Sequence, residues 1–480
     1  MRWLDSAVPV RMRRVALVAP DSALRDVLVR VAGTGAVQID RGHGEPARPG
    51  EAARGLRGGG RLPDPVLSAV RPDLEALERA GRDDLLAGEA QLQAYAGSAV
   101  RRSGAAALAG WIPAARLPEV TAAVAQAGGG VVALPRPAGV DAPTLLAGPP
   151  LHRALTPLVQ TYGTVPYADL DPTWLAWASY VLMFGMMFGD VGQGIFLLAV
   201  AAALRAGWPR WARRFRAAWP FVGGAGIAAT VFGLLYGECF GPTGLVPVIW
   251  LDPLSQPVTL LLVAGGVGAI LLAGAYALGL ANRWREGGWR FALYAPSGIA
   301  GSCVFLGAGL AAAGWYFHLS ALVAAGGGVA LAGLLLAFAG FLAEAGGGGT
   351  GAVQASVEVV DLVVRLGSNL VSFTRLAAFG LTHAALGLLV WDGARALWQR
   401  GGLLAVAGVG VFVAGTALAF ALGGLVAAIQ ALRLEYYELF SRVFVTQGEP
   451  FRPWHVPTQS SDEEAAEDRV PGLSMKGVDG

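Results

Sequence analysis

Polar and apolar positions divide the chain into two parts. Residues 1–170 mix short apolar runs with charged and turn-forming residues, whereas the following part consists mainly of long apolar runs. These runs fall near 173–204, 217–237, 257–281, 291–314, 319–343, 353–391 and 403–445. Because about 20 apolar residues in a helix cross the hydrocarbon core of a bilayer, the second part is predicted to be a helical bundle that crosses the membrane several times.

The composition supports this division. Of the 480 residues 54% are hydrophobic and 15% are charged, and the mean hydropathy is +0.52, all far from the averages of soluble domains. The net charge is +2 and no basic patch is interleaved with aromatic residues, so we expect no nucleic-acid partner. Cys239 and Cys303 lie in apolar surroundings without the spacing of a metal site, and are predicted to be inert thiols.

The first apolar run is too long for one crossing. At ~1.5 Å per residue its helix would be about 47 Å long, against about 30 Å of hydrocarbon. Its middle carries "FGDVGQG", with one aspartate and three glycines. The run is therefore either one long tilted helix or two short helices that meet at Gly189–Asp190.

Loop charges favour the second alternative. Five arginines in 205–216 and three in 282–290 predict that these loops are cytoplasmic, whereas 238–257 carries no basic residue and is expected outside. The N-terminus lacks the apolar core of a signal peptide, so the first part should also be cytoplasmic. Two crossings must then lie between residues 172 and 205. We expect about eight spans in a mainly α polytopic bundle in the cell membrane, the last two long and tilted, with both termini cytoplasmic.

The chain is accordingly divided into three regions. Residues 1–170 form a small α/β domain, 171–452 the membrane domain and 453–480 a polar tail that is predicted to be disordered. The α/β domain contains two β-α-β patterns, which we expect to form two small lobes. Between them lie a Gly/Pro/Arg linker over 41–64 and a short helical segment over 65–101.

An arginine inside an apolar run costs a few kcal/mol, about 2.5–3.5 on insertion scales, so Arg375 requires an explanation. It either pairs with a carboxylate of a neighbouring helix or faces a water-filled ion path. Asp361 lies 14 residues before Arg375, close to four helical turns, and His383 lies eight residues after it. All three are predicted near one face, which favours the ion path. Arg365 is four residues from Asp361 and could pair with it.

Further polar residues surround this stretch. They are Ser368 and Asn369 before Arg375, and Arg433 and Glu438 at the end of the last run. Arg433 could instead anchor the helix at the membrane surface beside tyrosines. No nucleotide-binding loop, Ser/His/Asp arrangement or metal-ligand helix is recognisable, so we expect no catalytic residue, cofactor or metal.

Several motifs together resemble one family, the membrane-embedded stator subunit of V-type and archaeal-type rotary ATPases, called subunit a or subunit I. They are "YGTVPYADLDPT", "FGMMFGDVGQG", "FGLLYGECFG", "SFTRLAAFGLTHAAL" and "LRLEYYELFSRVFVTQGEPFRPW". The similarity covers most of residues 12–454. The structural signature of the family falls here on Gly189, Asp190, Gly192 and Gly194.

The resemblance implies a function. In this family the arginine that matches Arg375 faces a rotor ring of proteolipid subunits and forces each passing carboxylate to lose its proton, while two offset half-channels admit protons from opposite sides. By matching position, Asp361, Ser368 and Asn369 would line one approach, and His383 and Arg433 the other. The subunit would be non-catalytic. Its expected partners are the ring, the peripheral stalk, the central-stalk or ring-cap subunit, membrane lipid and, indirectly, the ATP-hydrolysing head.

The chain departs from the family pattern at three places. Many relatives carry an acidic residue ten positions before the second arginine, where this chain has Gly423. The signature usually ends Gly-His-Gly, and here it is Gly-Gln193-Gly. The helical arm of the N-terminal domain is much shorter. Two alternatives therefore stand beside the pump subunit: an assembly scaffold that does not pump, and a stand-alone secondary transporter.

Overall fold

The computed structural model describes residues 8–40, 52–53, 56, 63–137, 139–294, 298–444 and 448–459. They form two compact units, one of residues 10–145 with 449–459 and one of residues 8–9 with 146–448. Most of the expected 41–64 linker and residues 460–480 of the expected tail lie outside the described part of the chain.

The first unit is built on an antiparallel sheet. Its path runs β2 (Gln38–Ile39), β5 (Ala105–Pro113), β1 (Met12–Pro20) and β6 (Gly130–Ala133), with β4 (Val100–Arg102) added at β5. In β1 buried and less buried residues alternate, as expected where one face is covered. Ser103 and Gly104, both at positive φ, make the tight turn between β4 and β5.

The expectation of two lobes is wrong. The two β-α-β patterns contribute strands to the same sheet, because β1 pairs with β5 along its whole length, from Met12↔Pro113 to Pro20↔Ala105. Helices α2 (Leu24–Thr34) and α6 (Leu117–Gln126) pack against each other, and their apolar residues join those of the strands in one core. Helices α4 (Leu74–Ala80) and α5 (Asp83–Gly97) fill the segment predicted to be helical.

Residues 453–459 belong to this unit, so the disordered tail does not begin at 453. Trp454 and Val456 are buried in its core, and β7 (Thr458–Gln459) pairs in parallel with β3 (Leu67–Ser68). The reason is local: two apolar side chains in an otherwise polar sequence cover the end of α2, where the Trp454 amide donates to the carbonyl of Val37 at 2.9 Å.

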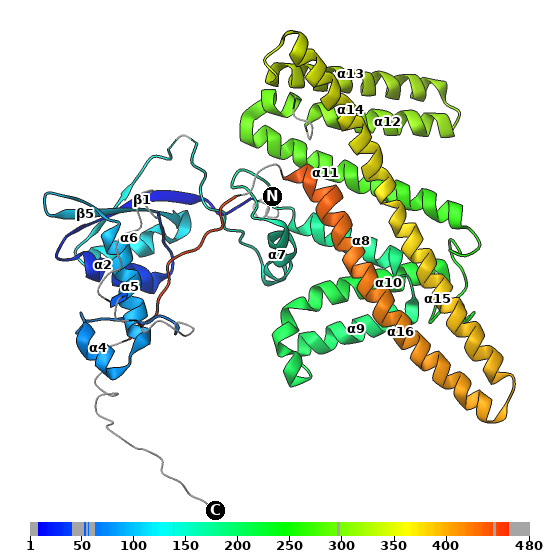
Figure 1. Cartoon of the computed structure of the whole chain (residues 1–480), viewed down its shortest axis with the longest axis horizontal. Coiled ribbons are helices and arrows are strands. Elements are labelled where there is room, and N and C mark those ends of the chain that lie inside the picture. The colour runs from blue at the N-terminus through cyan, green and yellow to red at the C-terminus, as the bar shows by residue number, and fades with distance from the viewer. Residues whose placement is uncertain are drawn as a thin grey trace, which may run out of the picture. The chain divides into compact units, whose positions relative to one another are not determined.

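The second unit is helical (Figure 1). After α7 (Pro150–Tyr162), its helices are α8 (Thr173–Met187), α9 (Val191–Ala206), the 3₁₀ helix η2 (Arg210–Ala218), α10 (Trp219–Tyr236), α11 (Pro257–Tyr294), α12 (Ile299–Tyr316), α13 (Ser320–Glu344), α14 (Gly348–Ser372), α15 (Thr374–Trp398), α16 (Gly402–Leu434), the π-helical turn η3 (Glu435–Phe440) and α17 (Ser441–Val443). In Figure 1, α14 and α15 form a nearly continuous rod, and α16 packs back along α15.

Six helical segments of the described chain are long and apolar enough to cross a membrane. They are Arg210–Tyr236, Pro257–Glu286, Ala292–Tyr316, Ser320–Glu344, Gly348–Trp398 and Gly402–Val443. Helices α8 and α9 are apolar but shorter. The chain is thus a mainly helical multi-pass membrane protein with an N-terminal α/β region, and a total of eight spans would require the two short helices to cross as well.

Candidate functional site

The first apolar run is two helices, as the loop charges indicated. Asp190 is the N-cap of α9 in an extended conformation, with φ of −145°. Its Oδ1 accepts from the Gln193 amide at 2.9 Å and its Oδ2 from the Gly241 amide at 3.0 Å. A buried carboxylate that caps a helix and holds a distant loop fixes the break between α8 and α9.

The signature glycines let α10 approach this break. A Cβ on Gly189 would lie 2.7 Å from the Tyr236 ring, one on Gly192 would lie 2.3 Å from Phe240, and one on Gly194 would lie 2.4 Å from Thr230. These separations are below any normal carbon contact. The four signature residues therefore build a packed helical hairpin.

Arg375 stands just after the junction of α14 and α15. The junction residue Phe373 is fully buried against Gly268 of α11, which fixes where the new helix begins. The Arg375 side chain is half-buried, and its Nη1 has no hydrogen-bond partner among the described residues. A guanidinium that is partly desolvated without an internal carboxylate argues against the simple ion-pair interpretation.

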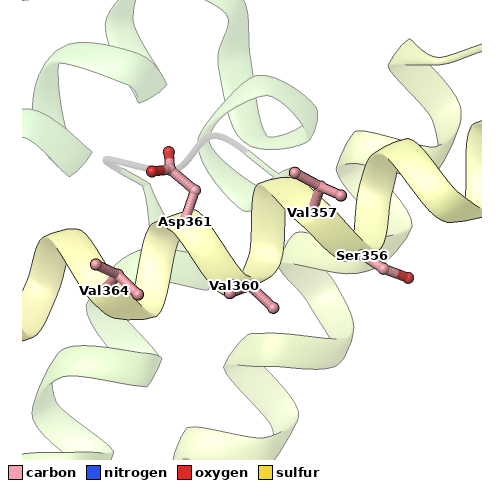
Figure 2. Close-up of a pocket in the computed structure, with 5 residues that line it drawn as sticks. All are labelled: Ser356, Val357, Val360, Asp361 and Val364. Carbon is pink, nitrogen blue, oxygen red and sulfur yellow. The ribbon is translucent and has the colours of Figure 1, made fainter.

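Asp361 lies two turns before Ser368 on α14 and forms the expected pair with Arg365. The two charged groups are 2.5 Å apart, and the side chains remain 41% and 66% exposed, respectively. Asp361 also borders a shallow, open hollow formed with Ser356, Val357, Val360 and Val364 of the same helix (Figure 2). Asp361 is thus an accessible carboxylate on the outer side of α14, and Ser368 is likewise exposed.

Two polar contacts tie α14 to the C-terminal segment. Glu438 is buried and accepts a hydrogen bond from Ser372. With its amide turned to satisfy both neighbours, Asn369 accepts from Nη2 of Arg442 at 2.6 Å and donates to the Arg365 carbonyl at 3.1 Å. The structure thus brings Asn369 and Glu438 into one polar seam, and it adds Ser372 and Arg442.

Glu435 is a further carboxyl group at the end of the last run, and it was not predicted to be a site residue. This residue begins the π-helical turn, is 1% exposed, and accepts from Ser179 of α8 at 2.6 Å. Arg433, two residues earlier, is exposed, and no ion pair joins it to another described residue. Irregular π-helical turns cost stability and are frequent at functional sites.

His383 faces the interior, away from Asp361. It is 5% exposed, its ring lies 4.5 Å from the Phe188 ring between centroids, and its Nδ1 has no partner among the described residues. Gly423 of α16 lies against the same nitrogen. Asp361 lies on α14 whereas Arg375 and His383 lie on α15, and no contact joins the three to one another in the described structure.

Further polar side chains lie near the two ends of the helical unit. At one end, Asn282 of α11 accepts from the Leu170 amide at 3.0 Å and donates to the Val443 carbonyl at 3.4 Å. At the other, Gly387, one turn beyond His383, contacts Gly241 of the loop held by Asp190. That loop also contains Glu238, which is 5% exposed; burial, followed by the charges of Asp190 and Asp252, raises its pKa to about 8.

The fold and these buried ionisable groups define a polytopic membrane protein with polar residues set along its longest helices. Residues 99–242 match the model of the V-type ATPase 116 kDa subunit family. This match confirms the resemblance seen in the motifs over that part of the chain.

Relatives span most of this chain. A-type ATP synthase subunit I of Pyrococcus horikoshii is 26% identical, over 79% of this chain and 58% of its own length. The protein of the same name from Aeropyrum pernix is 28% identical, over 66% and 51%. V-type ATP synthase subunit I 2 of Treponema pallidum is 37% identical over 24% of each chain. The chain therefore spans between 51% and 58% of the length of the first two relatives.

Proposed function

We propose that the chain is the non-catalytic membrane subunit of a rotary ATPase and that it carries the ion path beside the rotor ring. Arg375 is the residue that would face the ring carboxylates. Nη1 of its half-buried guanidinium has no hydrogen-bond partner among the described residues, which supports this role, because a fixed positive charge favours the deprotonated form of a carboxylate that passes it.

In this proposal, one half-channel leads to Arg375 from each end of the helical unit. Asp361, Ser368, Asn369 and Glu438 would serve the end that carries Asn282 and Val443. His383 would serve the opposite end, where Glu238 is a buried carboxylate available in place of an acidic residue at 423. We propose that the arginine-rich segments 205–216 and 282–290 mark the cytoplasmic end, which places residues 1–170 and the C-terminus in the cytoplasm.

The partners in this proposal are the ring of proteolipid subunits, the peripheral stalk, the ring-cap subunit and lipid. The shortened segment between β3 and β4, with α4 and α5 in place of a long helical arm, would reduce the surface available to the stalk. The ATP-hydrolysing head would be reached only through these subunits.

The test is ATP-driven acidification of inverted vesicles that contain the whole complex. Arg375→Ala is expected to leave assembly intact and to abolish acidification. Arg375→Lys is expected to retain little activity, since a lysine can lose its proton where solvent is scarce. Arg395→Ala is the matched control, because this exposed arginine ends the same helix. Normal acidification by an assembled Arg375→Ala complex would refute the role of this residue.

Two alternatives have distinct outcomes in the same system. A non-pumping scaffold is favoured by the close packing of His383 at Gly423, which leaves no room there for a carboxylate. It predicts a wild-type complex that assembles and hydrolyses ATP without acidification. A stand-alone transporter, suggested by the break between α8 and α9, predicts ion movement by the purified chain in liposomes without a ring.

A further inference from the structure

The last turn of α9 and the segment between α9 and α10 carry a concentration of exposed charge that the proposed ion path does not use. Their five arginines are Arg205, Arg210, Arg213, Arg214 and Arg216, and all are exposed. The sequence has no acidic residue from 191 to 237, and no described residue forms an ion pair with any of the five. This positive charge is therefore not neutralised within the described structure.

The segment is also strongly aromatic. Trp208 and Trp211 are 72% and 71% exposed, and Phe215 is 48% exposed. Two arginines lie over rings, Arg205 over Trp219 at 5.0 Å and Arg214 over Phe215 at 4.8 Å. Exposed tryptophan beside arginine is the composition of a segment that lies in a membrane–water interface.

The 3₁₀ geometry of η2 arranges these groups in rows. Because a 3₁₀ helix repeats every three residues, Arg210, Arg213 and Arg216 fall in one row along it. Ala212, which is 3% exposed, lies against the protein. The helix is thus fixed on the body of the unit with a row of guanidinium groups turned away from its buried side.

The depth of the segment follows from its neighbours. It joins the end of α9 to the start of α10, and these helices pack antiparallel, with Gly194 beside Thr230 and Gly223 beside Ala201. The candidate span that contains α10 begins at Arg210, so η2 forms its arginine-rich end, and α9 is a shorter apolar helix packed against α10. With this span in a bilayer, η2 would lie at the bilayer surface, where lipid phosphates are the available negative groups.

We propose that η2 and its flanking residues form a binding surface for anionic phospholipid headgroups. Guanidinium groups bind phosphate through paired hydrogen bonds, and the exposed rings would lie among the headgroups and upper acyl chains. The inference is independent of ion translocation. The surface would hold this end of α9 and α10 at a fixed depth in an anionic leaflet.

The test uses the purified full-length chain in mild detergent and measures lipid adducts by native mass spectrometry. The probes are dioleoylphosphatidylglycerol and dioleoylphosphatidylcholine, which differ in headgroup charge. Wild type is expected to bind the anionic lipid about five-fold or more tightly. The variant Arg210→Gln/Arg213→Gln/Arg214→Gln/Arg216→Gln should lose that preference.

The control variant removes the same charge elsewhere. Arg13, Arg30, Arg71 and Arg102 are exposed arginines of the other unit, and their replacement by glutamine should leave the preference unchanged. If the quadruple η2 variant does not fold, Arg210→Gln/Arg213→Gln should still halve the preference or more. Equal affinity of wild type for the two lipids, or an unchanged preference in a folded η2 variant, would overturn the proposal.

Discussion

The imidazole of His383 fills the space beside the Cα of Gly423. A Cβ added to Gly423 would lie 2.9 Å from Nδ1 of His383 and 3.2 Å from the Phe188 ring. Position 423 is where many relatives of this subunit type are expected to carry an acidic residue. In this chain the glycine and the buried histidine are complementary in shape, and a longer side chain at position 423 would overlap the imidazole.

Gly423→Ala is therefore expected to destabilise the chain relative to Gly424→Ala. The new methyl group overlaps His383 at 423, whereas at 424 it would meet Phe188 at an ordinary 3.7 Å. Both residues lie in α16, so the gain in helix propensity cancels between the variants. Overpacking should make the difference about 1–3 kcal/mol in favour of Gly424→Ala. Thermal unfolding in one detergent measures it.

The same steric argument predicts a rescue. His383→Ala removes the side chain that Gly423→Ala overlaps, so the double variant should be more stable than the sum of the two single effects implies. Additive effects would mean that the two residues do not contact each other in the folded chain.

Asp190→Ala should loosen the loop that follows α10. The change removes the acceptors of the Gln193 and Gly241 amides, and two buried N–H groups without partners should cost about 2–4 kcal/mol. The nearby thiol of Cys239 reports the change when Cys303 is replaced by serine. In the Cys303→Ser background, maleimide should label Cys239 several-fold faster when Asp190 is replaced by alanine. Asp190→Asn should give an intermediate labelling rate. Equal labelling rates would contradict the anchoring role.

Features that depend on residues close together in the sequence could be predicted from the sequence alone. The break at Gly189–Asp190 could be inferred because an aspartate and glycines interrupt an apolar run that is too long for one crossing. The Asp361–Arg365 pair could be inferred because residues four apart on a helix are neighbours. Both β-α-β patterns could also be recognised, because each strand and helix is marked by the apolar periodicity of a short continuous segment.

Contacts between distant segments could not be predicted in this way. The sequence separation of β1 and β5 does not indicate whether they pair. The two β-α-β patterns were therefore equally compatible with two lobes and with one sheet. Ser372 and Glu438 are 66 positions apart and Ser179 and Glu435 are 256 apart, and only the packing of α8, α14 and η3 brings each pair together. Trp454 and Val456 were missed because two apolar residues carry no periodicity.

Ser179→Ala and Glu435→Gln should differ in their effects. Ser179→Ala leaves a buried carboxylate without its side-chain donor, which should cost about 1–3 kcal/mol. Glu435→Gln keeps an acceptor for the serine hydroxyl and cannot ionise in this buried position, so it should cost less. Thermal unfolding of both variants and of the double variant gives the coupling between the two side chains. A coupling near zero would show that the contact contributes nothing to stability.

Asp169 lies in the segment that precedes α8 and is fully buried. It faces the last turns of the apolar part of α11, where Glu286, Arg283 and Arg285 carry the neighbouring charges. Burial, followed by the carboxyl group of Glu286, raises the pKa of Asp169 to about 8, against 3.8 for an exposed aspartate. Between these values the folded chain holds a proton that the unfolded chain releases.

Stability should therefore fall as the pH rises from about 4 to about 8 through this group, and should stop falling above its folded pKa. Asp169→Asn keeps the shape of the side chain and cannot ionise, so its contribution is constant. The difference in melting temperature between Asp169→Asn and wild type should grow in favour of the variant from pH 5 to pH 8.5. Taking this difference cancels other groups such as Asp84 and Glu119, whose lowered pKa values act in the opposite direction. A difference that is flat across this range would mean that Asp169 is ionised in the folded chain.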